Sequence, residues 1–285
     1  MKHVLVAGAT GYLGGFMVQE LKARGYLVRA IARSPEKLRD LQGAVDEIVK
    51  AEITQPETLE HVCDGIDVVF SSIGITKQKD KVTFRDVDYQ GNVNLLEAAQ
   101  RAGVRKFIYV SVFNGPNLLH LDIVKAHEDF VDELKASGID YAVLRPTGYF
   151  SDMGEFLTMA KKGRVYLIGR GSSKVNPIHG ADLAVECVHA LEGEEKEIDV
   201  GGPEVFTYRE IAELAFQALG KPVRITSVPV WIMKLLVVAT RILNKHQGEL
   251  LAFFTTAVIS NVVAPMTGTC SLATHFAEVV TEHEQ

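Results

Sequence analysis

The chain has 285 residues, of which 47% are hydrophobic and 23% charged, and its formal net charge at pH 7 is −6. A chain of this size can bury a full core, as one large domain or as one domain with a smaller annex. The acidic balance argues against a nucleic-acid-binding protein, which needs a cationic face, so we expect no nucleic-acid partner. Cys63, Cys187 and Cys270 lie far apart, and we expect neither a disulfide framework nor a metal site. Because a strand-like run opens the chain without a signal-peptide pattern, we expect a cytoplasmic protein.

The first predicted elements are a strand, a tight turn and a helix. Residues 3–14, HVLVAGATGYLG, are apolar up to Gly8 and then carry Gly11 and Gly14 at three-residue spacing. Glycines here let a phosphate approach the backbone at the start of the helix that follows. A second strand over residues 28–32 completes a β-α-β unit of about thirty residues. The pattern predicts a dinucleotide-binding site.

Apolar strand-like runs continue to alternate with helical patterns through the first half of the chain. This alternation predicts an α/β fold with a doubly wound parallel Rossmann sheet, covered by helices on both faces. Because ligands bind at the carboxyl ends of parallel strands, we expect Gly8, Ser71, Ser111 and Pro146 to converge on one crevice. The further predicted strands are residues 45–49, 67–72, 106–112 and 141–144, and the predicted helices are residues 35–42, 56–63, 86–102 and 122–137.

The pattern loosens after about residue 150, where glycine-rich turns separate shorter pieces. We therefore divide the chain into a NAD(P)-binding Rossmann domain over residues 1–150 and a smaller substrate region over residues 151–285. We expect this second region to form a small mixed lid subdomain. Within it, residues 175–200 are predicted to return to the Rossmann sheet.

The end of the second predicted strand, VRAIARSPEK, indicates which nucleotide is bound. NAD-type sites place an acid here for the ribose hydroxyls, whereas this chain has Ala32 followed by Arg33, with Ser34 and Lys37 nearby. A guanidinium can bind a 2′-phosphate by a paired, charge-assisted contact, and we expect no carboxylate to be available at this position to repel it. We expect a preference for NADP(H), with NAD(H) as a weaker ligand.

Several segments together resemble the atypical short-chain dehydrogenases/reductases of the NmrA-like type. They are GATGYLGG, VRAIAR, DVDYQGNVNLLEAA, KFIYVSVF, SGIDYAVLRPTGYF and NPIHGADLA, and they occur in this order. That family includes quinone reductases and divinyl chlorophyllide vinyl reductases, and the latter are especially similar to this chain. It also includes non-catalytic cofactor sensors and assembly factors. The resemblance implies the fold and the cofactor far more specifically than the substrate.

The resemblance also implies roles for individual residues around a bound dinucleotide. It assigns the pyrophosphate turn, the 2′-phosphate contact at Arg33, the adenosine loop, the strand end beside the nicotinamide, and the wall after the sixth strand. The residues implied for the cofactor are Gly8, Thr10, Gly11, Tyr12, Leu13, Gly14, Arg33, Ser34, Lys37, Ser71, Ser72, Ile73, Gly74, Ser111, Val112, Lys125, Pro146, Thr147, Gly148 and Tyr149.

Ordinary members of the family use a Tyr-x-x-x-Lys pair that this chain lacks. The helix after Ser111 reads LHLDIVKAHEDFVDEL, in which Leu121 stands four residues before Lys125. Many relatives carry their lysine where this chain has His127. Either Lys125 acts from an offset position, or His127 carries the proton and ribose roles. We take Ser111, Lys125, His127 and Tyr149 as candidate catalytic residues.

The C-terminal third contains two strongly apolar stretches, residues 228–243 and 250–264. Both are shorter than the about 20 residues that a membrane-spanning helix needs. Lys234, Arg241 and Lys245 recur at helical spacing, and we expect them to form a cationic stripe. Such helices can pack within the protein, cover an apolar ligand, or lie on a membrane surface, so the predicted location includes a membrane-peripheral one. The sequence leaves the oligomeric state open.

These observations favour an NADP(H)-binding reductase of an apolar conjugated or quinone-like substrate. Without the tyrosine, ordinary carbonyl reduction is disfavoured, whereas hydride delivery to a conjugated bond can be followed by protonation from solvent. We expect Phe113, Asn114, Phe150 and Met153 to line the substrate pocket. The alternative is a non-catalytic NADP(H)-binding redox sensor or assembly factor, which the missing tyrosine also favours.

Overall fold

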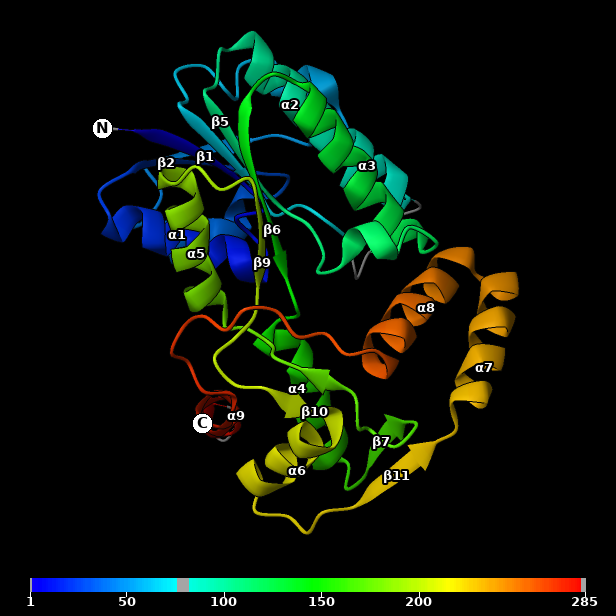
Figure 1. Ribbon diagram of the computed structural model, residues 1–285. Coiled ribbons are helices and arrows are strands. Elements are labelled where there is room, and N and C mark those ends of the chain that lie inside the picture. The colour runs from blue at the N-terminus through cyan, green and yellow to red at the C-terminus, as the bar shows by residue number, and fades with distance from the viewer. Residues whose placement is uncertain (1, 76–81, 283–285) are drawn as a thin grey trace. The chain divides into compact units, whose positions relative to one another are not determined.

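The computed structural model describes residues 2–75 and 82–282, and its centre is a seven-stranded sheet (Figure 1). The strand order is β3-β2-β1-β4-β5-β6-β9, and the pairings from β3 through β6 are parallel. This order, with the crossover between β1 and β4, is that of a doubly wound Rossmann sheet. The strands are β1 (His3–Ala7), β2 (Leu27–Ala32), β3 (Glu47–Lys50), β4 (Val68–Ser71), β5 (Lys106–Val110), β6 (Asp140–Pro146) and β9 (Glu197–Val200).

Helices cover both faces of this sheet, with α1 and α5 on one face and α2 and α3 on the other (Figure 1). Strands β4 and β5 are buried from end to end, and β1 is buried after its first residue, which explains why their sequences read as nearly continuous apolar runs. The predicted fold class is therefore confirmed. The helices of this part are α1 (Tyr12–Ala23), α2 (Asn92–Arg101), α3 (Asp122–Ala136) and α5 (Gly180–Glu192).

Three predicted helices are wrong in type or length. Residues 35–42 form the 3-10 helix η1 (Pro35–Leu41), and residues 56–63 form the short 3-10 helix η2 (Pro56–Leu59). The predicted helix over residues 86–102 is divided into the π-helix η3 (Arg85–Gly91) and α2. A proline at the start of η1 and of η2 satisfies the sequence signal for a helix start, but neither segment is long enough to bury an α-helical face.

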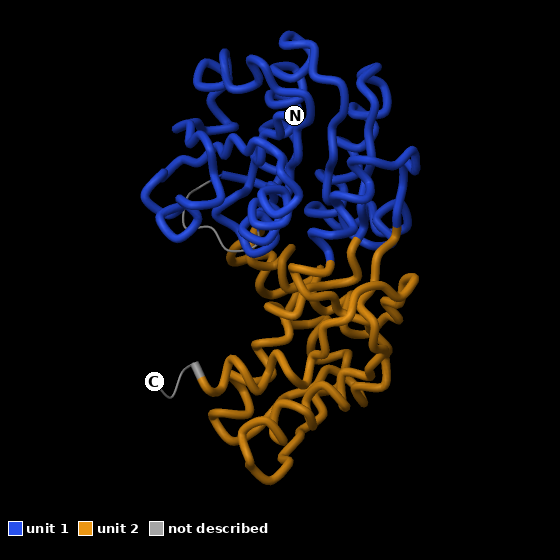
Figure 2. The backbone as a smooth tube through the Cα atoms, turned by 90° about the vertical axis from the view of Figure 1, so that its left-hand side faces the viewer, with its two compact units in different colours: residues 1–145, 183–198 blue, residues 146–182, 199–285 orange. Residues whose placement is uncertain are grey.

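Backbone contacts divide the chain into two compact units, which Figure 2 colours separately. The first unit contains Met1–Arg145 and Leu183–Ile198, and the second contains Pro146–Asp182 and Asp199–Gln285. The second unit has its own core, in which Phe150, Phe216 and Phe276 are almost fully buried. Its elements are α4 (Phe150–Lys161), β7 (Val165–Ile168), β8 (Lys174–Val175), β10 (Phe206–Thr207), α6 (Tyr208–Ala218), β11 (Ile225–Val228), α7 (Val230–Leu243), α8 (Lys245–Ile259) and α9 (Leu272–Glu282).

Two small sheets complete the second unit, so it is mixed in character. Strands β11 and β7 pair in parallel, and strands β10 and β8 pair antiparallel. A capping box at Thr207 and Glu210 starts α6 immediately after β10. The predicted apolar helices correspond to α7 and α8, although α8 begins five residues before its predicted start at residue 250.

Candidate functional site

The turn between β1 and α1 has the geometry of a phosphate cradle. Gly8 adopts a φ of +94°, and the Gly11 amide donates a hydrogen bond to the Gly8 carbonyl at 2.8 Å. A Cβ on Gly8 would lie 2.8 Å from Ser72 Oγ, and a Cβ on Gly14 would lie 2.0 Å from the Gly8 carbonyl oxygen. Helix α1 begins directly after Gly11, and no acidic residue lies in its first turn. The N-terminus of α1 can therefore accept an anion, and glycine is required on both sides of it.

A cavity of about 290 Å³ opens beside this turn within the first unit. Its wall includes Gly8, Thr10 and Gly11 from the turn and Ala32 and Arg33 from the end of β2. Ser34 and Lys37, which the sequence also suggested for the cofactor, are absent from the part of the wall that the structure describes. The remaining described wall residues are Ile31, Ala51, Glu52, Ile53, Thr54, Gln55, Ser72, Ile73, Gly74, Ile75, Val82 and Val87.

Arg33 shares this cavity with a carboxylate that the sequence analysis missed. Nε of Arg33 lies 3.4 Å from Oε2 of Glu52, and the Thr54 hydroxyl donates to Oε1 of Glu52 at 3.1 Å. The Arg33 side chain is 58% exposed, so its guanidinium remains accessible to a ligand. The expectation of a site without a nearby carboxylate is wrong, because Glu52 follows β3 and parallel pairing brings β3 beside β2. Any 2′-phosphate on Arg33 would also face Glu52.

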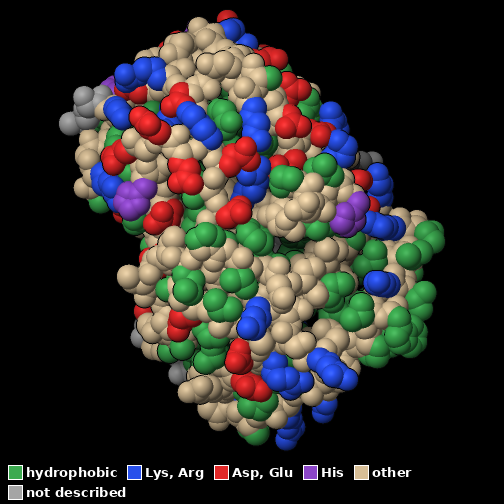
Figure 3. All heavy atoms as spheres, in the orientation of Figure 1, with side chains coloured by type: hydrophobic (Ala, Val, Ile, Leu, Met, Phe, Trp, Pro, Cys, Tyr) green, Lys and Arg blue, Asp and Glu red, His purple; other side chains and the backbone are tan. Residues whose placement is uncertain are grey.

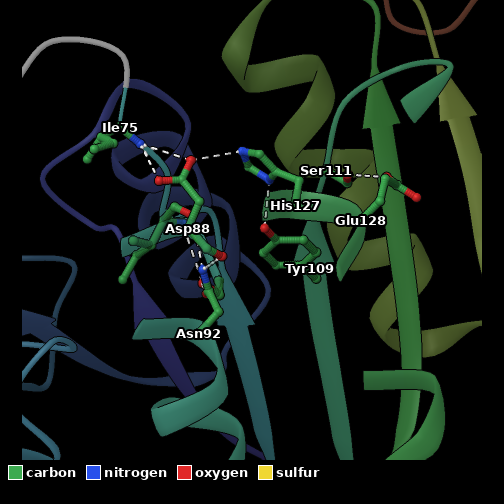
Figure 4. A network of polar contacts seen from close by, with 9 residues as sticks. Ile75, Asp88, Asn92, Tyr109, Ser111, His127 and Glu128 are labelled. Carbon is green, nitrogen blue, oxygen red and sulfur yellow. Dashed lines mark hydrogen bonds and ion pairs between the residues drawn. The ribbon is translucent and has the colours of Figure 1, made fainter. Parts of the chain in front are cut away.

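The loop that follows β4 is fixed by buried polar side chains. The Ser71 hydroxyl donates to Oδ1 of Asn92 at 2.6 Å, and Nδ2 of Asn92 donates to the Ile73 carbonyl at 3.3 Å. The Ile75 amide donates to the Asp88 carboxylate, with both oxygens at 3.3 Å. Ser72, Ile73 and Gly74 of this loop line the cavity. These bonds to Asn92 and Asp88 therefore hold residues 71–75 in place at the wall of the cavity (Figure 4).

Asp88 also belongs to a buried chain that passes through His127 to Tyr109. Nε2 of His127 lies 3.1 Å from Oδ1 of Asp88, and Nδ1 of His127 lies 2.6 Å from the Tyr109 hydroxyl (Figure 4). Burial raises the pKa of Asp88 above its usual range, and burial raises the pKa of Tyr109 well above 10. Tyr109 therefore keeps its proton and can donate to Nδ1, while a proton on Nε2 faces Asp88. A Cβ on Gly74 would lie 3.2 Å from the His127 ring, so this ring lies directly behind the cavity loop.

Ser111 takes part in a second buried network. Its hydroxyl donates to Oε1 of Glu128 at 2.6 Å, and the same carboxylate forms an ion pair with Arg145 at 2.8 Å. Nη1 of Arg145 lies 2.7 Å from Glu197, which also pairs with Lys135. Ser111, Glu128 and Arg145 are all less than 10% exposed. The Ser111 hydroxyl, which the resemblance placed beside the nicotinamide, thus stabilises a buried carboxylate.

Lys125, Tyr89 and Asn114 lie in more open surroundings than His127. The Lys125 side chain is 55% exposed and pairs with Asp129 at 2.6 Å on the same helix. Tyr89 donates to Glu133 at 3.0 Å and packs under the guanidinium of Arg85. Asn114, which has a φ of +58°, accepts a hydrogen bond from Asn117. The structure therefore places His127, rather than Lys125, in contact with the cavity loop, and the catalytic roles stay predictions.

The predicted residues from Pro146 onward belong to the second unit. The Thr147 hydroxyl donates to the Asn176 carbonyl at 2.5 Å, and the Tyr149 amide donates to Asp152 at 3.3 Å. Phe150 and Met153 are buried in the core of this unit, with 2% and 7% exposure. Their assignment to a substrate pocket stays a prediction. Among the described residues, no cluster of three His, Cys, Asp or Glu side chains could hold a metal ion.

A model of a known protein family covers most of the Rossmann unit. The family is described as NAD(P)H-binding, and it matches residues 8–194, which include the glycine turn, the cavity loop and every member of the two buried networks except Glu197. The chain belongs to the NAD(P)H-binding family. The resemblance inferred from the sequence motifs is therefore confirmed. The cofactor class that the family's description names is NAD(P)H.

Similar proteins include both a reductase and an assembly factor. Divinyl chlorophyllide a 8-vinyl-reductase of Arabidopsis thaliana is 30% identical over 81% of this chain, and the chain spans 61% of its length. The photosystem II assembly factor Ycf39 of Trieres chinensis is 26% identical over 81% of this chain and 74% of its own length. The solved structure of an NADPH-dependent quinone oxidoreductase of Escherichia coli, with 18% identity, matches 99% of this chain and 100% of its own with a TM-score of 0.76. That likeness confirms the fold.

Proposed function

We propose that this NAD(P)H-binding protein is an NADP(H)-dependent reductase that reduces a conjugated carbon–carbon double bond, or a quinone-like acceptor, in an apolar molecule. The observation that supports this most is the hydrogen bond from Ser111 to Glu128. A carbonyl reductase needs a hydroxyl free to protonate the carbonyl oxygen, whereas here the hydroxyl at the end of β5 is bound to a buried carboxylate.

The described residues fit the cofactor. Gly8 and Gly11, with the N-terminus of α1, would hold the pyrophosphate, and Arg33 would hold the 2′-phosphate beside Glu52. When bound, NADPH supplies a hydride from C4 of its nicotinamide. The chain's own contribution is to hold the loop of residues 71–75 rigid and to keep Ser111 and Tyr109 away from the acceptor.

A conjugated acceptor suits a site of this kind. Hydride addition to an activated double bond places the negative charge on a delocalised group, and water can protonate that group afterwards. A tyrosine with a lowered phenol pKa is then not needed. This agrees with the sequence, in which Leu121 occupies the position four residues before Lys125. The likeness to a vinyl reductase supports this choice of acceptor, although the chain spans less than two thirds of that relative's length.

A second function, cofactor-dependent assembly or sensing without turnover, is favoured by one observation. Both buried networks at β5 are closed, because Tyr109 pairs with His127 and Ser111 pairs with Glu128. Such closed networks hold a shape rather than transfer protons. The likeness to the photosystem II assembly factor supports the same alternative.

The experiment that separates the two functions measures NADPH oxidation with paired acceptors. Each enone, vinyl-substituted ring or quinone is compared with a saturated ketone of the same carbon skeleton. We expect turnover with the conjugated member of a pair and none with the saturated one. Arg33→Ala serves as the control, because turnover at this site must then require more NADPH. Tight NADPH binding without oxidation in any pair would support the assembly or sensing role.

A further inference from the structure

Helices α7 and α8 form a hairpin whose outer surface is strongly apolar. Of the fifteen exposed large hydrophobic side chains among the described residues, twelve lie between Val223 and Met266. Seven of these are on α7, where Val237 is the single buried residue. Figure 3 shows green side chains gathered over this hairpin. The seven are Trp231 (63% exposed), Ile232 (39%), Leu235 (62%), Leu236 (49%), Val238 (54%), Ile242 (80%) and Leu243 (87%).

On the inner side of the hairpin, α7 packs closely against α8, and these contacts hold α7 in place. A Cβ on Gly248 would lie 2.5 Å from the backbone nitrogen of Arg241, so α7 and α8 approach closely there. The Arg241 guanidinium forms an ion pair with the buried Glu249 at 2.9 Å. The expectation that Arg241 joins Lys234 and Lys245 in an outward cationic stripe is therefore wrong. The apolar residues of α7, and not this arginine, form the outer surface.

The same part of the chain carries an unusual charge. Residues 214–277 contain five lysine and arginine side chains and one carboxylate, a net charge of +4 within a chain whose total is −6. The single carboxylate is Glu249, which Arg241 already neutralises. The other four cations are exposed, and they are Lys221, Arg224, Lys234 and Lys245. Of these, Lys234 and Lys245 lie on the hairpin itself. An apolar surface that carries exposed cations is complementary to a layer of anionic headgroups above hydrocarbon.

We propose that the α7–α8 hairpin binds the surface of a bilayer that contains anionic lipids, with α7 lying in the interface. Helix α7 has 14 residues and α8 has 15, so each is about 21–23 Å long, whereas a hydrocarbon core is about 30 Å thick. Among the described residues, no helix is long and apolar enough to cross a membrane. The hairpin therefore lies along the surface and does not span it.

The distribution of apolar residues favours lipid over a second copy of the chain. Trp231, Leu235, Val238 and Ile242 form one stripe, and Ile232 and Leu236 lie about 100° further round the helix. The acyl chains of a bilayer are fluid, so they can contact the whole of this wide apolar face. Two copies of this surface would bring the exposed Lys234 and Lys245 side chains of each copy close to those of the other, which costs free energy.

Trp231 reports directly on this binding, because it is the single tryptophan of the chain and lies on the proposed surface. The full chain is mixed with phosphatidylcholine vesicles or with vesicles that also contain phosphatidylglycerol. We expect a blue shift of tryptophan emission and co-flotation with the anionic vesicles. Unchanged emission together with no flotation would overturn the proposal. A blue shift that instead grows with protein concentration without lipid would identify a second copy as the occupant and also overturn it.

Matched variants test which residues carry the binding. Leu235→Gln should weaken vesicle affinity about tenfold or more, since it removes an exposed apolar side chain from the interface. Leu119→Gln, at a residue of similar exposure in the first unit, should leave the affinity unchanged. Lys234→Gln should weaken binding about fivefold to anionic vesicles alone. Equal affinities for Leu235→Gln and Leu119→Gln, with both variants folded by circular dichroism, would contradict the assignment to α7.

Discussion

Nε2 of His127 lies 3.1 Å from Oδ1 of Asp88, and both side chains are almost completely closed to solvent. Through this contact, a residue on α3 supports a carboxylate that holds the Ile75 amide in the cavity loop. The position that carries a lysine in many relatives thus has a histidine here that faces the protein interior. His127 thus helps to hold the cavity loop in place through Asp88.

Replacing His127 should lower the free energy of unfolding much more than replacing Lys125. His127→Ala leaves the Tyr109 hydroxyl and the Asp88 carboxylate without a shared partner, and we expect a loss of about 3 kcal/mol or more in the free energy of unfolding. Lys125→Ala removes an exposed ion pair and should change stability by less than about 1 kcal/mol. Urea unfolding and NADPH titration of both variants check this. Weaker NADPH binding in Lys125→Ala than in His127→Ala would show that Lys125 replaces the family lysine.

The pH dependence of stability should reveal the raised pKa of Asp88. Because burial raises this pKa in the folded state, the folded chain binds the proton more readily than the unfolded chain does. The contribution of Asp88 to stability therefore falls as the pH rises above about 4, the ordinary pKa of an aspartate, through the raised value. Asp88→Asn keeps an acceptor for Ile75 and does not titrate. In urea unfolding at several pH values, the free energy of unfolding of Asp88→Asn should rise relative to that of the wild-type chain as the pH rises. The opposite trend would mean that His127 outweighs burial.

Two adjacent glycines on α1 provide a sharp test of the cradle. Gly14→Ala would place a Cβ 2.0 Å from the Gly8 carbonyl oxygen, so we expect a loss of about 3 kcal/mol or more and no measurable NADPH binding. Gly15→Ala meets no atom within 4 Å and should raise stability by up to about 1 kcal/mol. Thermal unfolding and NADPH titration measure both effects. Similar behaviour of the two variants would contradict the packing of α1 on β1.

Cofactor preference should depend on Arg33 and Glu52 in opposite directions. Arg33→Ala should weaken NADPH binding about ten- to hundredfold and change NADH binding little, because charged hydrogen bonds to the 2′-phosphate are lost. Glu52→Gln should strengthen NADPH binding, since it removes a negative charge 3.4 Å from the guanidinium. Calorimetric titration with both nucleotides checks this. An unchanged ratio of affinities in Arg33→Ala would remove Arg33 from the specificity site.

The fold and the cofactor cradle were predictable because their signals are local. The Gly8–Gly14 spacing and the alternation of buried strands with helices specify the β1-α1-β2 unit and the sheet within short segments. The same patterns predicted helix type and length poorly at Pro35 and Pro56, where the segments that begin with proline are 3-10 helices.

The polar contacts of the site were not predictable because they join distant segments. Glu52 reaches Arg33 through the pairing of β3 with β2, and Asp88, His127 and Tyr109 come from three separate elements. The motif DVDYQG contains Asp88, but it gives no sign of a partner 39 positions later in the chain. The ion pair of Arg241 likewise depends on a later residue, Glu249, on the next helix.

The most direct test of the proposed reductase follows the hydrogen atom itself. NADPH deuterated at C4 is supplied with an enone or vinyl-substituted acceptor under anaerobic conditions, and the product is examined by mass spectrometry and NMR. We expect one deuterium on a carbon of the former double bond. NADPH binding with no deuterium on carbon in any conjugated acceptor, together with no NADPH oxidation by a quinone, would contradict the reductase and leave the role of an assembly factor or sensor.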